Sequence, residues 1–159
     1  MIVSQSRRNY SISEGNKAED KFSRLMNSRG NTCIKSSKHD DIYKHIDFYV
    51  NNIGIDVKGN RHLETIWVEL NNVKGKKGWL RGDAEYIVFD VVELKSFCFF
   101  KRDELLEFCS NITEATKDKT EYRKLYSRKD RDDLLIKYRF EDIKHLQIQN
   151  SRKIGTGRR

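Results

Sequence analysis

Residues 45–59 read HIDFYVNNIGIDVKG, and this stretch decides the fold. Apolar and polar side chains alternate on both sides of Asn51 and Asn52, as expected for two strands joined by a tight turn, because Asn tolerates left-handed backbone. If these asparagines form the turn, Asp47 lies directly opposite Asp56 on one side of the hairpin. The apolar residues project from the other side: Ile46, Phe48, Val50, Ile55 and Val57. The stretch therefore predicts a β-hairpin with one apolar face and one acidic face.

A third charged side chain, Lys58, projects from the acidic face, because it lies two residues beyond Asp56. Opposed carboxylates destabilise a sheet, and a divalent cation would reverse that cost, since carboxylate oxygens suit Mg²⁺ or Mn²⁺. A neighbouring ammonium can orient a metal-bound water or stabilise charge on a phosphate, so these residues suit phosphodiester hydrolysis. Zinc is disfavoured, because the four histidines lack ligand spacing: His39, His45, His62 and His145. The alternative is an ordinary polar face of an exposed hairpin.

The same residues resemble the motif of the PD-(D/E)XK nucleases, in which an acid begins one strand and Asp/Glu-x-Lys lies on the next. Asp47 matches the first acid and Asp56-Val57-Lys58 matches the second motif, while Ile46 stands where the family has its proline. Residues 15–30 (GNKAEDKFSRLMNSRG) look like the leading helix of small Holliday-junction-resolvase-like and phage-type members. The similarity covers residues 14–91.

This resemblance implies an α/β, restriction-endonuclease-like core with a mixed central β-sheet flanked by helices. It also implies a metal-dependent endonuclease that hydrolyses DNA phosphodiester bonds, with Mg²⁺ (or Mn²⁺) held by Asp47 and Asp56, assisted by Glu19. Lys58 would position the attacking water. Similarity to resolvases implies branched DNA and a homodimer. The alternatives are a homing- or restriction-type endonuclease of the same fold and a non-catalytic nucleic-acid-binding module, and RNA remains open as a substrate.

Two further acids have alternatives of their own. On a helical wheel, Glu14 and Glu19 flank the apolar stripe of the leading helix on opposite edges, and Glu14 also has capping-box spacing from Ser11. We therefore favour Glu19 as the helix acid that the resemblance implies. Glu69, on the next predicted strand, is a candidate additional metal ligand, or else an exposed strand charge beside Trp67.

The excess positive charge lies in two segments without any acid. Lys plus Arg is 32 and Asp plus Glu is 24, so the net charge is +8. Residues 71–82 (NNVKGKKGWLRG) and 149–159 (QNSRKIGTGRR) supply that excess. Two local basic patches predict a polyanionic partner such as DNA, and the alternative is a solvated loop and tail. The predicted phosphate-binding residues are Lys74, Lys76, Lys77, Arg81, Arg152, Lys153, Arg158 and Arg159.

Within the first basic segment, Trp79 has two readings. Its ring could stack on an unpaired base, beside glycines that let the backbone approach a phosphate. Alternatively, Trp79 belongs to the core. The sequence favours neither reading.

The pattern along the chain predicts a single nuclease-like α/β domain over residues 11–148, preceded by a flexible arm (1–10) and followed by a basic tail (149–159). Residues 110–132 are too charged to assign. Helices are expected at 14–28, 101–109 and 140–146, and strands at 32–35, 45–51, 53–58, 66–70, 85–92, 96–100 and 134–138.

Composition excludes several classes of protein. The 159 residues include eight Phe, seven Tyr and two Trp, which argues against wholesale disorder although 35% of residues are charged. No window approaches the ~20 apolar residues of a membrane span. Three cysteines without paired spacing fit a reducing compartment better than a disulfide framework. We therefore expect a cytoplasmic protein that is neither secreted nor embedded in a membrane.

Overall fold

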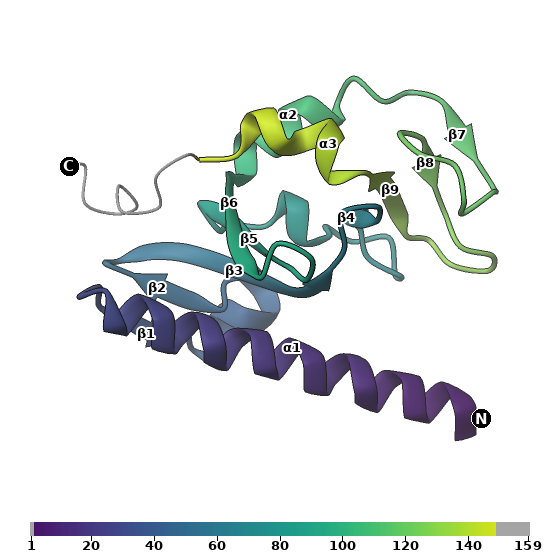
Figure 1. The fold of residues 1–159 in the computed structure, drawn as a ribbon. Coiled ribbons are helices and arrows are strands. Elements are labelled where there is room, and N and C mark those ends of the chain that lie inside the picture. The colour runs from purple at the N-terminus through teal and green to yellow at the C-terminus, as the bar shows by residue number, and fades with distance from the viewer. Residues whose placement is uncertain (1, 149–159) are drawn as a thin grey trace.

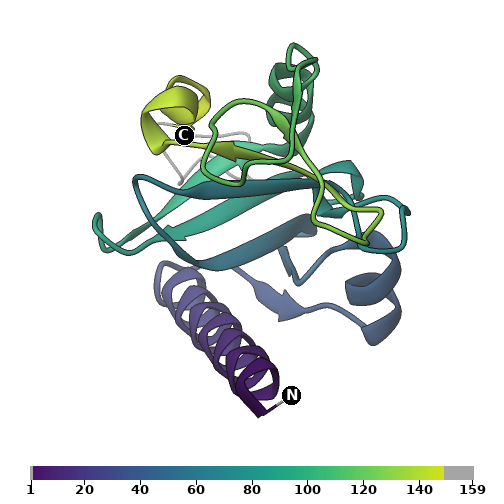
Figure 2. The ribbon, with the colours of Figure 1, turned by 90° about the vertical axis from the view of Figure 1, so that its right-hand side faces the viewer.

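The computed structural model describes residues 2–148, and it describes side chains from residue 15 onward. Two β-sheets pack face to face, with α1 (Ile2–Ser28) below them and α2 (Arg102–Cys109) and α3 (Phe140–Ile143) above (Figure 1). Figure 2 shows the same layers from the side, with the purple helix α1 opposite the yellow-green α3. The expected mixed α/β class is confirmed.

The first sheet has the strand order β1-β2-β3-β5-β6, and only β3 and β5 run parallel. Its strands are β1 (Cys33–Lys35), β2 (Phe48–Val50), β3 (Ile53–Arg61), β5 (Tyr86–Val91) and β6 (Ser96–Lys101). Between β1 and β2 lies the π-helical turn η1 (Asp40–Lys44).

The second sheet has the order β4-β9-β8-β7, in which only β7 and β8 run parallel. Its strands are β4 (Ile66–Asn71), β7 (Ala115–Thr116), β8 (Leu125–Tyr126) and β9 (Leu134–Tyr138). The 3₁₀ turns η2 (Trp79–Arg81) and η3 (Lys144–Leu146) complete the described elements.

The hairpin at the centre of the sequence analysis has the predicted register. Phe48 pairs with Ile55 and Val50 with Ile53. Asn51 and Asn52 have φ of 50° and 69°, so both turn residues adopt the left-handed backbone that a two-residue hairpin turn of this kind needs. The first strand is shorter than expected and begins only at Phe48.

Two apolar clusters hold the layers together. One lies between α1 and the first sheet, where Ala18, Phe22 and Met26 pack on the apolar face of the hairpin. The other lies between the sheets and is built from alternate residues of β4, β5 and β9. The two clusters cover opposite faces of the first sheet, because neighbouring residues of β5, such as Ile87 and Val88, belong to different clusters.

Two details of the predicted architecture are wrong. The single central sheet is instead two sheets, because the chain turns back after β3 through a bridge between His62 and Thr65, and β4 pairs with β9. The N-terminal arm is helical from Ile2, since residues 2–10 contain no Gly or Pro that would end the helix. The predicted basic tail, residues 149–159, lies outside the described residues. Within the described chain no helix is long and apolar enough to span a bilayer.

Candidate active site

Asp47 lies at the point where β2 no longer covers the edge of β3. β2 pairs with β3 only through Ile55, so the next amides of β3 need other acceptors. Asp47 Oδ2 accepts a hydrogen bond of 2.8 Å from the Val57 N–H. The Asp47 side chain is thereby oriented at the sheet edge, with only 7% of its surface exposed.

Asp56 lies beside it on β3 and is 2% exposed. It pairs with Ile87 of β5 and therefore projects toward the cluster between the two sheets. Its Oδ1 lies 3.2 Å from Lys58 Nζ, while its buried Oδ2 has no hydrogen-bond partner. A buried carboxylate oxygen without a partner is costly unless something else compensates its charge.

Burial opposes the ionisation of both carboxyls. Burial raises the pKa of Asp47 to about 7, the charge on Asp56 adds to this rise, and Lys58 together with the Val57 amide opposes it. Burial also raises the pKa of Asp56, against the opposing charge of Lys58. The polar face of the hairpin is therefore buried and electrostatically strained, unlike the solvated face of an ordinary exposed hairpin.

Lys58 is held in place by two neighbours. Besides its contact with Asp56, its ammonium lies 4.9 Å from the centroid of the Trp79 ring, within cation–π range. Trp79 is 8% exposed and meets Phe89 edge-on in the inter-sheet cluster. Trp79 therefore occupies a core position, as the second of its two interpretations expects, and its ring is buried rather than presented for stacking. The Trp79 ring thus helps to hold the Lys58 ammonium in place.

Helix α1 brings Glu19 to the same place. Glu19, Asp47 and Lys58 all line a pocket of about 300 Å³ at the free edge of β3. Glu19 Oε1 lies 2.8 Å from Lys35 Nζ of β1. Burial raises the pKa of Glu19, and the charge of Asp47 contributes to the rise although Lys35 opposes it. Glu19, Asp47 and Lys58 therefore converge on this pocket, and Asp56 contacts Lys58 beside it. The side chain of the alternative helix acid, Glu14, lies outside the described part of the chain.

Sequence reasoning missed Arg61, which also lines this pocket. Lys58 pairs with Phe89 but Arg61 with Val91, so β3 carries an extra residue here, and Asn60 adopts a φ of 55°. Such a bulge turns Arg61 toward the same side as Lys58. Its Nε is buried without a partner, and burial lowers its pKa while the charge of Asp56 opposes the change. The Gly59-Asn60 pair within a strand was the signal for the bulge.

Glu69 does not join this group. It lies on β4 in the second sheet, and its Oε1 accepts a hydrogen bond of 3.3 Å from the Trp79 N–H. It is not among the residues that line the pocket. The candidate role of Glu69 as a metal ligand is therefore not supported by its position. Across the residues whose side chains are described, no group of three or more His, Cys, Asp or Glu is placed to share a metal ion.

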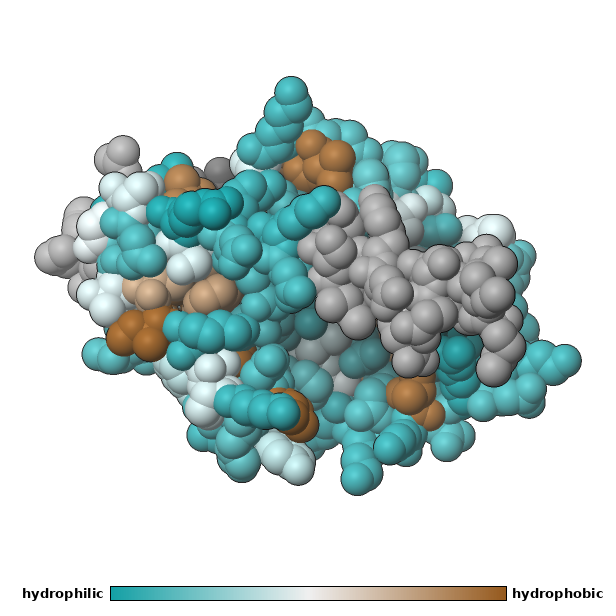
Figure 3. Space-filling view, turned by 90° about the horizontal axis from the view of Figure 1, so that it is seen from below, coloured by the Kyte–Doolittle hydropathy of each residue, from teal (hydrophilic) through white to brown (hydrophobic). Residues whose placement is uncertain are grey.

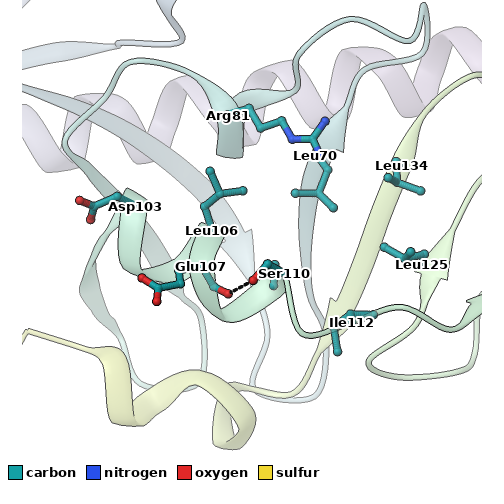
Figure 4. A pocket seen from close by; sticks show the side chains of 10 residues that line it. Leu70, Arg81, Asp103, Leu106, Glu107, Ser110, Ile112, Leu125 and Leu134 are labelled. Carbon is teal, nitrogen blue, oxygen red and sulfur yellow. Dashed lines mark hydrogen bonds between the residues drawn. The ribbon is translucent and has the colours of Figure 1, made fainter.

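The four cations of the predicted basic loop do not line the carboxylate pocket. Lys74, Lys76 and Lys77 are exposed, and none forms an ion pair within the described chain. Arg81 donates a hydrogen bond of 2.8 Å to Asn71 Oδ1 and lies at the rim of a different, largely apolar cavity of about 510 Å³ (Figure 4). Figure 4 shows Leu106 of α2 among the side chains that line that cavity. The predicted tail residues Arg152, Lys153, Arg158 and Arg159 lie outside the described residues.

Comparison of the chain with models of protein families, with curated proteins and with solved structures gives no match.

Proposed function

We propose that this protein is a divalent-metal-dependent endonuclease that hydrolyses phosphodiester bonds of DNA, with its active site at the free edge of β3. The observation that carries the proposal is the pair of buried carboxylates, Asp47 and Asp56, beside an ammonium, Lys58. The resemblance of these residues to the PD-(D/E)XK motif supports it further. The implied substrate is branched DNA cut by a homodimer, and a homing- or restriction-type endonuclease of this fold is the alternative.

The donor set fits Mg²⁺ or Mn²⁺. All of the acidic donors here are carboxylate oxygens, which hard divalent cations prefer, and Asp56 Oδ2 is buried without a partner. A cation near Asp47 and Asp56 would offset the burial that raises the pKa of both carboxyls, and the charge of Asp56 that adds to the rise at Asp47. Glu19 lines the same pocket and would assist, provided that it gives up its contact with Lys35. The metal, when bound, would acidify a water and stabilise charge on a phosphate.

The protein's own groups have distinct tasks in this proposal. The Val57 amide fixes Asp47, and the Trp79 ring and Asp56 fix Lys58. An ammonium held in this way can donate to the attacking water or to a phosphate oxygen without reorganising. Lys74, Lys76, Lys77 and Arg81 would contact backbone phosphates, which adds affinity but no sequence readout.

The test is incubation with Mg²⁺, Mn²⁺ or EDTA and a panel of linear, nicked, four-way and single-stranded DNA, with RNA counterparts. We expect metal-dependent cleavage of DNA, strongest on branched molecules. Binding without cleavage in every metal would contradict the proposal and favour the non-catalytic binding module. Cleavage of RNA alone would overturn the choice of substrate. The control is Asp133→Asn, which alters a buried carboxylate beside the other sheet, just before β9.

A further inference from the structure

Arg61 lines the carboxylate pocket with most of its hydrogen-bonding capacity unused. Its Nη1 donates a hydrogen bond of 2.8 Å to the carbonyl oxygen of Gly59, whereas its Nε is buried without a partner. It forms no ion pair with any of the residues that the structure describes. A guanidinium is always charged and has five N–H donors, and a buried donor without an acceptor is costly. The side chain of Arg61 is therefore suited to an acceptor that comes from outside the described chain.

Two other arginines show how this chain satisfies a guanidinium that has a structural role. The Nε of Arg102 donates to the carbonyl oxygen of Ala84, and the Nε of Arg128 donates to Asp133 Oδ2, each at 2.6 Å. In both side chains the N–H nearest to the backbone therefore has an acceptor within the protein. Arg61 differs from them in this one atom, which is buried and unpaired.

The carboxylates near Arg61 are held by other cations. Asp56 Oδ1 lies 3.2 Å from Lys58 Nζ, and Glu19 Oε1 lies 2.8 Å from Lys35 Nζ. The charge of Asp56 raises the pKa of Arg61 against the effect of burial, but the two side chains form no ion pair. Arg61 is therefore not needed as the structural counter-ion of these carboxylates.

Two aromatic rings in contact hold the two cations of β3 that line this pocket. The guanidinium carbon of Arg61 lies 6.0 Å from the centroid of the Phe89 ring, and Lys58 Nζ lies 4.9 Å from that of the Trp79 ring. The two rings meet edge-on, with their centroids 6.1 Å apart. The backbone is fixed as well, because the Arg61 carbonyl oxygen accepts a hydrogen bond of 2.8 Å from the Val92 N–H. The guanidinium is thus oriented before any ligand arrives.

The chemistry of the pocket favours a phosphate as the missing acceptor. A guanidinium presents a planar fork of N–H donors that matches two oxygens of a phosphate. The carboxylates of Asp47 and Asp56 suit a divalent cation, for which phosphate oxygens are ligands too. An apolar ligand is disfavoured, because the described surface seen from the α1 side is mostly hydrophilic, with small and separate apolar patches (Figure 3).

We propose that Arg61 is a catalytic residue that binds the phosphate whose ester bond is cut, donating to its non-bridging oxygens. This inference rests on the proposed function, because it takes the carboxylate pocket as the place of hydrolysis. In that reaction the water oxygen bonds to phosphorus and gives up a proton. The ester P–O bond breaks, and its electron pair stays on the leaving oxygen, which takes up a proton. Donors of Arg61 that are already in place stabilise the charge of the phosphoryl group during the transfer.

The first test follows the Arg61 Nε–H group by NMR in the isotope-labelled wild-type protein. Inorganic phosphate is titrated in Mg²⁺ and in EDTA at fixed ionic strength. We expect the Arg61 signal to shift and saturate in at least one of these conditions, because the buried N–H gains an acceptor. The Nε–H signal of Arg102 is the internal control and should stay in place, since Ala84 already accepts its hydrogen bond. An Arg61 signal that is fixed in both conditions would overturn the inference, and an equal shift with acetate would overturn the choice of phosphate.

The second test measures DNA cleavage by Arg61→Lys. The rate should fall by ~100-fold, because an ammonium cannot replace a planar fork of donors on the phosphate. Binding of duplex DNA in EDTA should change only a few-fold, since affinity comes from many phosphate contacts. The rise in Tm with Mg²⁺ should remain, because Arg61 is not a metal ligand. The matched control is Arg128→Lys, the same substitution beside the other sheet, which should keep the wild-type rate per folded molecule.

The two tests together separate this inference from the proposed function. If the wild type cleaves DNA and Arg61→Lys cleaves at the same rate, the catalytic role of Arg61 is overturned alone. If the wild type cleaves no substrate but its Arg61 signal shifts with phosphate, the nuclease is overturned and Arg61 remains a phosphate-binding residue. If Arg61→Lys does not fold, the phosphate titration of the wild-type protein decides.

Discussion

Two sets of buried aspartates in this molecule have pKa values that are shifted in opposite directions. Asp47 and Asp56 in the first sheet are 7% and 2% exposed, and Asp133, beside the second sheet, is 1% exposed. Asp133 receives hydrogen bonds of 2.9 Å and 2.6 Å from the backbone N–H and the Nε of Arg128. Burial would raise the pKa of Asp133, but these hydrogen bonds from Arg128 lower it below its usual value.

The difference shows that hydrogen-bond and ion-pair partners, rather than burial, distinguish a structural carboxylate from a candidate functional one. Asp133 has its cation within the chain and needs no other. The Asp47–Asp56 pair shares one lysine and leaves Asp56 Oδ2 without a partner, and burial raises the pKa of both carboxyls. Unsatisfied charge of this kind is the usual signature of a site that binds or reacts.

The largest expected effect is on cleavage. Asp56→Ala should lower metal-dependent cleavage of DNA by more than ~100-fold, because the groups that place the metal and water are lost, while binding changes only a few-fold. Asp47→Ala and Lys58→Ala should behave in the same way. Asp133→Asn should keep the wild-type rate per folded molecule. Full activity of Asp56→Ala would end the assignment of the site, and loss of activity in Asp133→Asn would remove the contrast between the two sets.

The pH dependence of stability should have opposite signs at the two places. Asp47 has a pKa near 7 in the fold against an ordinary value of 3.8, so the folded state holds the extra proton between these values. Wild-type stability should fall relative to Asp47→Asn as pH rises from about 4 to 7, by roughly 1 kcal/mol per pH unit. The contribution of Asp133 is instead present above pH 3.8 and lost as pH falls below it. Urea unfolding across this range measures both.

Removing the structural carboxylate should cost more stability than removing a candidate functional one. Asp133→Ala leaves the Arg128 amide and guanidinium without their acceptor, and we expect a loss of about 2 kcal/mol at neutral pH. Denaturant unfolding in EDTA provides the free energy. A change below ~0.5 kcal/mol would show that Asp133 is not needed for the fold.

Divalent metal should stabilise the wild-type protein through Asp47 and Asp56, and not through Asp133. A cation that binds only the folded state at ten times its Kd adds about 1.4 kcal/mol, so Mg²⁺ or Mn²⁺ should raise the Tm. Asp56→Asn should lose most of this response, because an amide oxygen is a weaker ligand for a hard cation. Asp133→Asn should keep it. Thermal unfolding at fixed ionic strength separates binding from screening.

The smallest expected effect is on the stability of the metal-free protein, and it compares the same substitution at Asp56 and at Asp133. In EDTA, Asp56→Asn should be more stable than the wild type by ~0.5–1 kcal/mol, because it relieves the repulsion between opposed carboxylates. The same substitution at Asp133 should be destabilising. If Asp56→Asn is less stable without metal and keeps the metal response, then Asp47 and Asp56 do not share a cation.

Sequence alone was sufficient for the hairpin and its acidic face. The register between β2 and β3 follows from the alternation of side chains and from Asn51-Asn52, both of which are local properties. That register places Asp47, Asp56 and Lys58 together whatever the rest of the chain does. The helical stripe that carries Glu19 is likewise a local pattern, so its approach to the sheet was predictable once the apolar face of the hairpin was known.

The features that only the tertiary structure decided depend on contacts between residues far apart in the chain. Trp79 is a core residue because it packs against Phe89 and Lys58. Glu69 accepts a hydrogen bond from the Trp79 N–H instead of joining the pocket, because the turn at Trp79 returns to β4. Arg61 enters the site through a bulge against β5. Side-chain periodicity reports on neighbours along one element, whereas burial and charge proximity depend on which elements pack together.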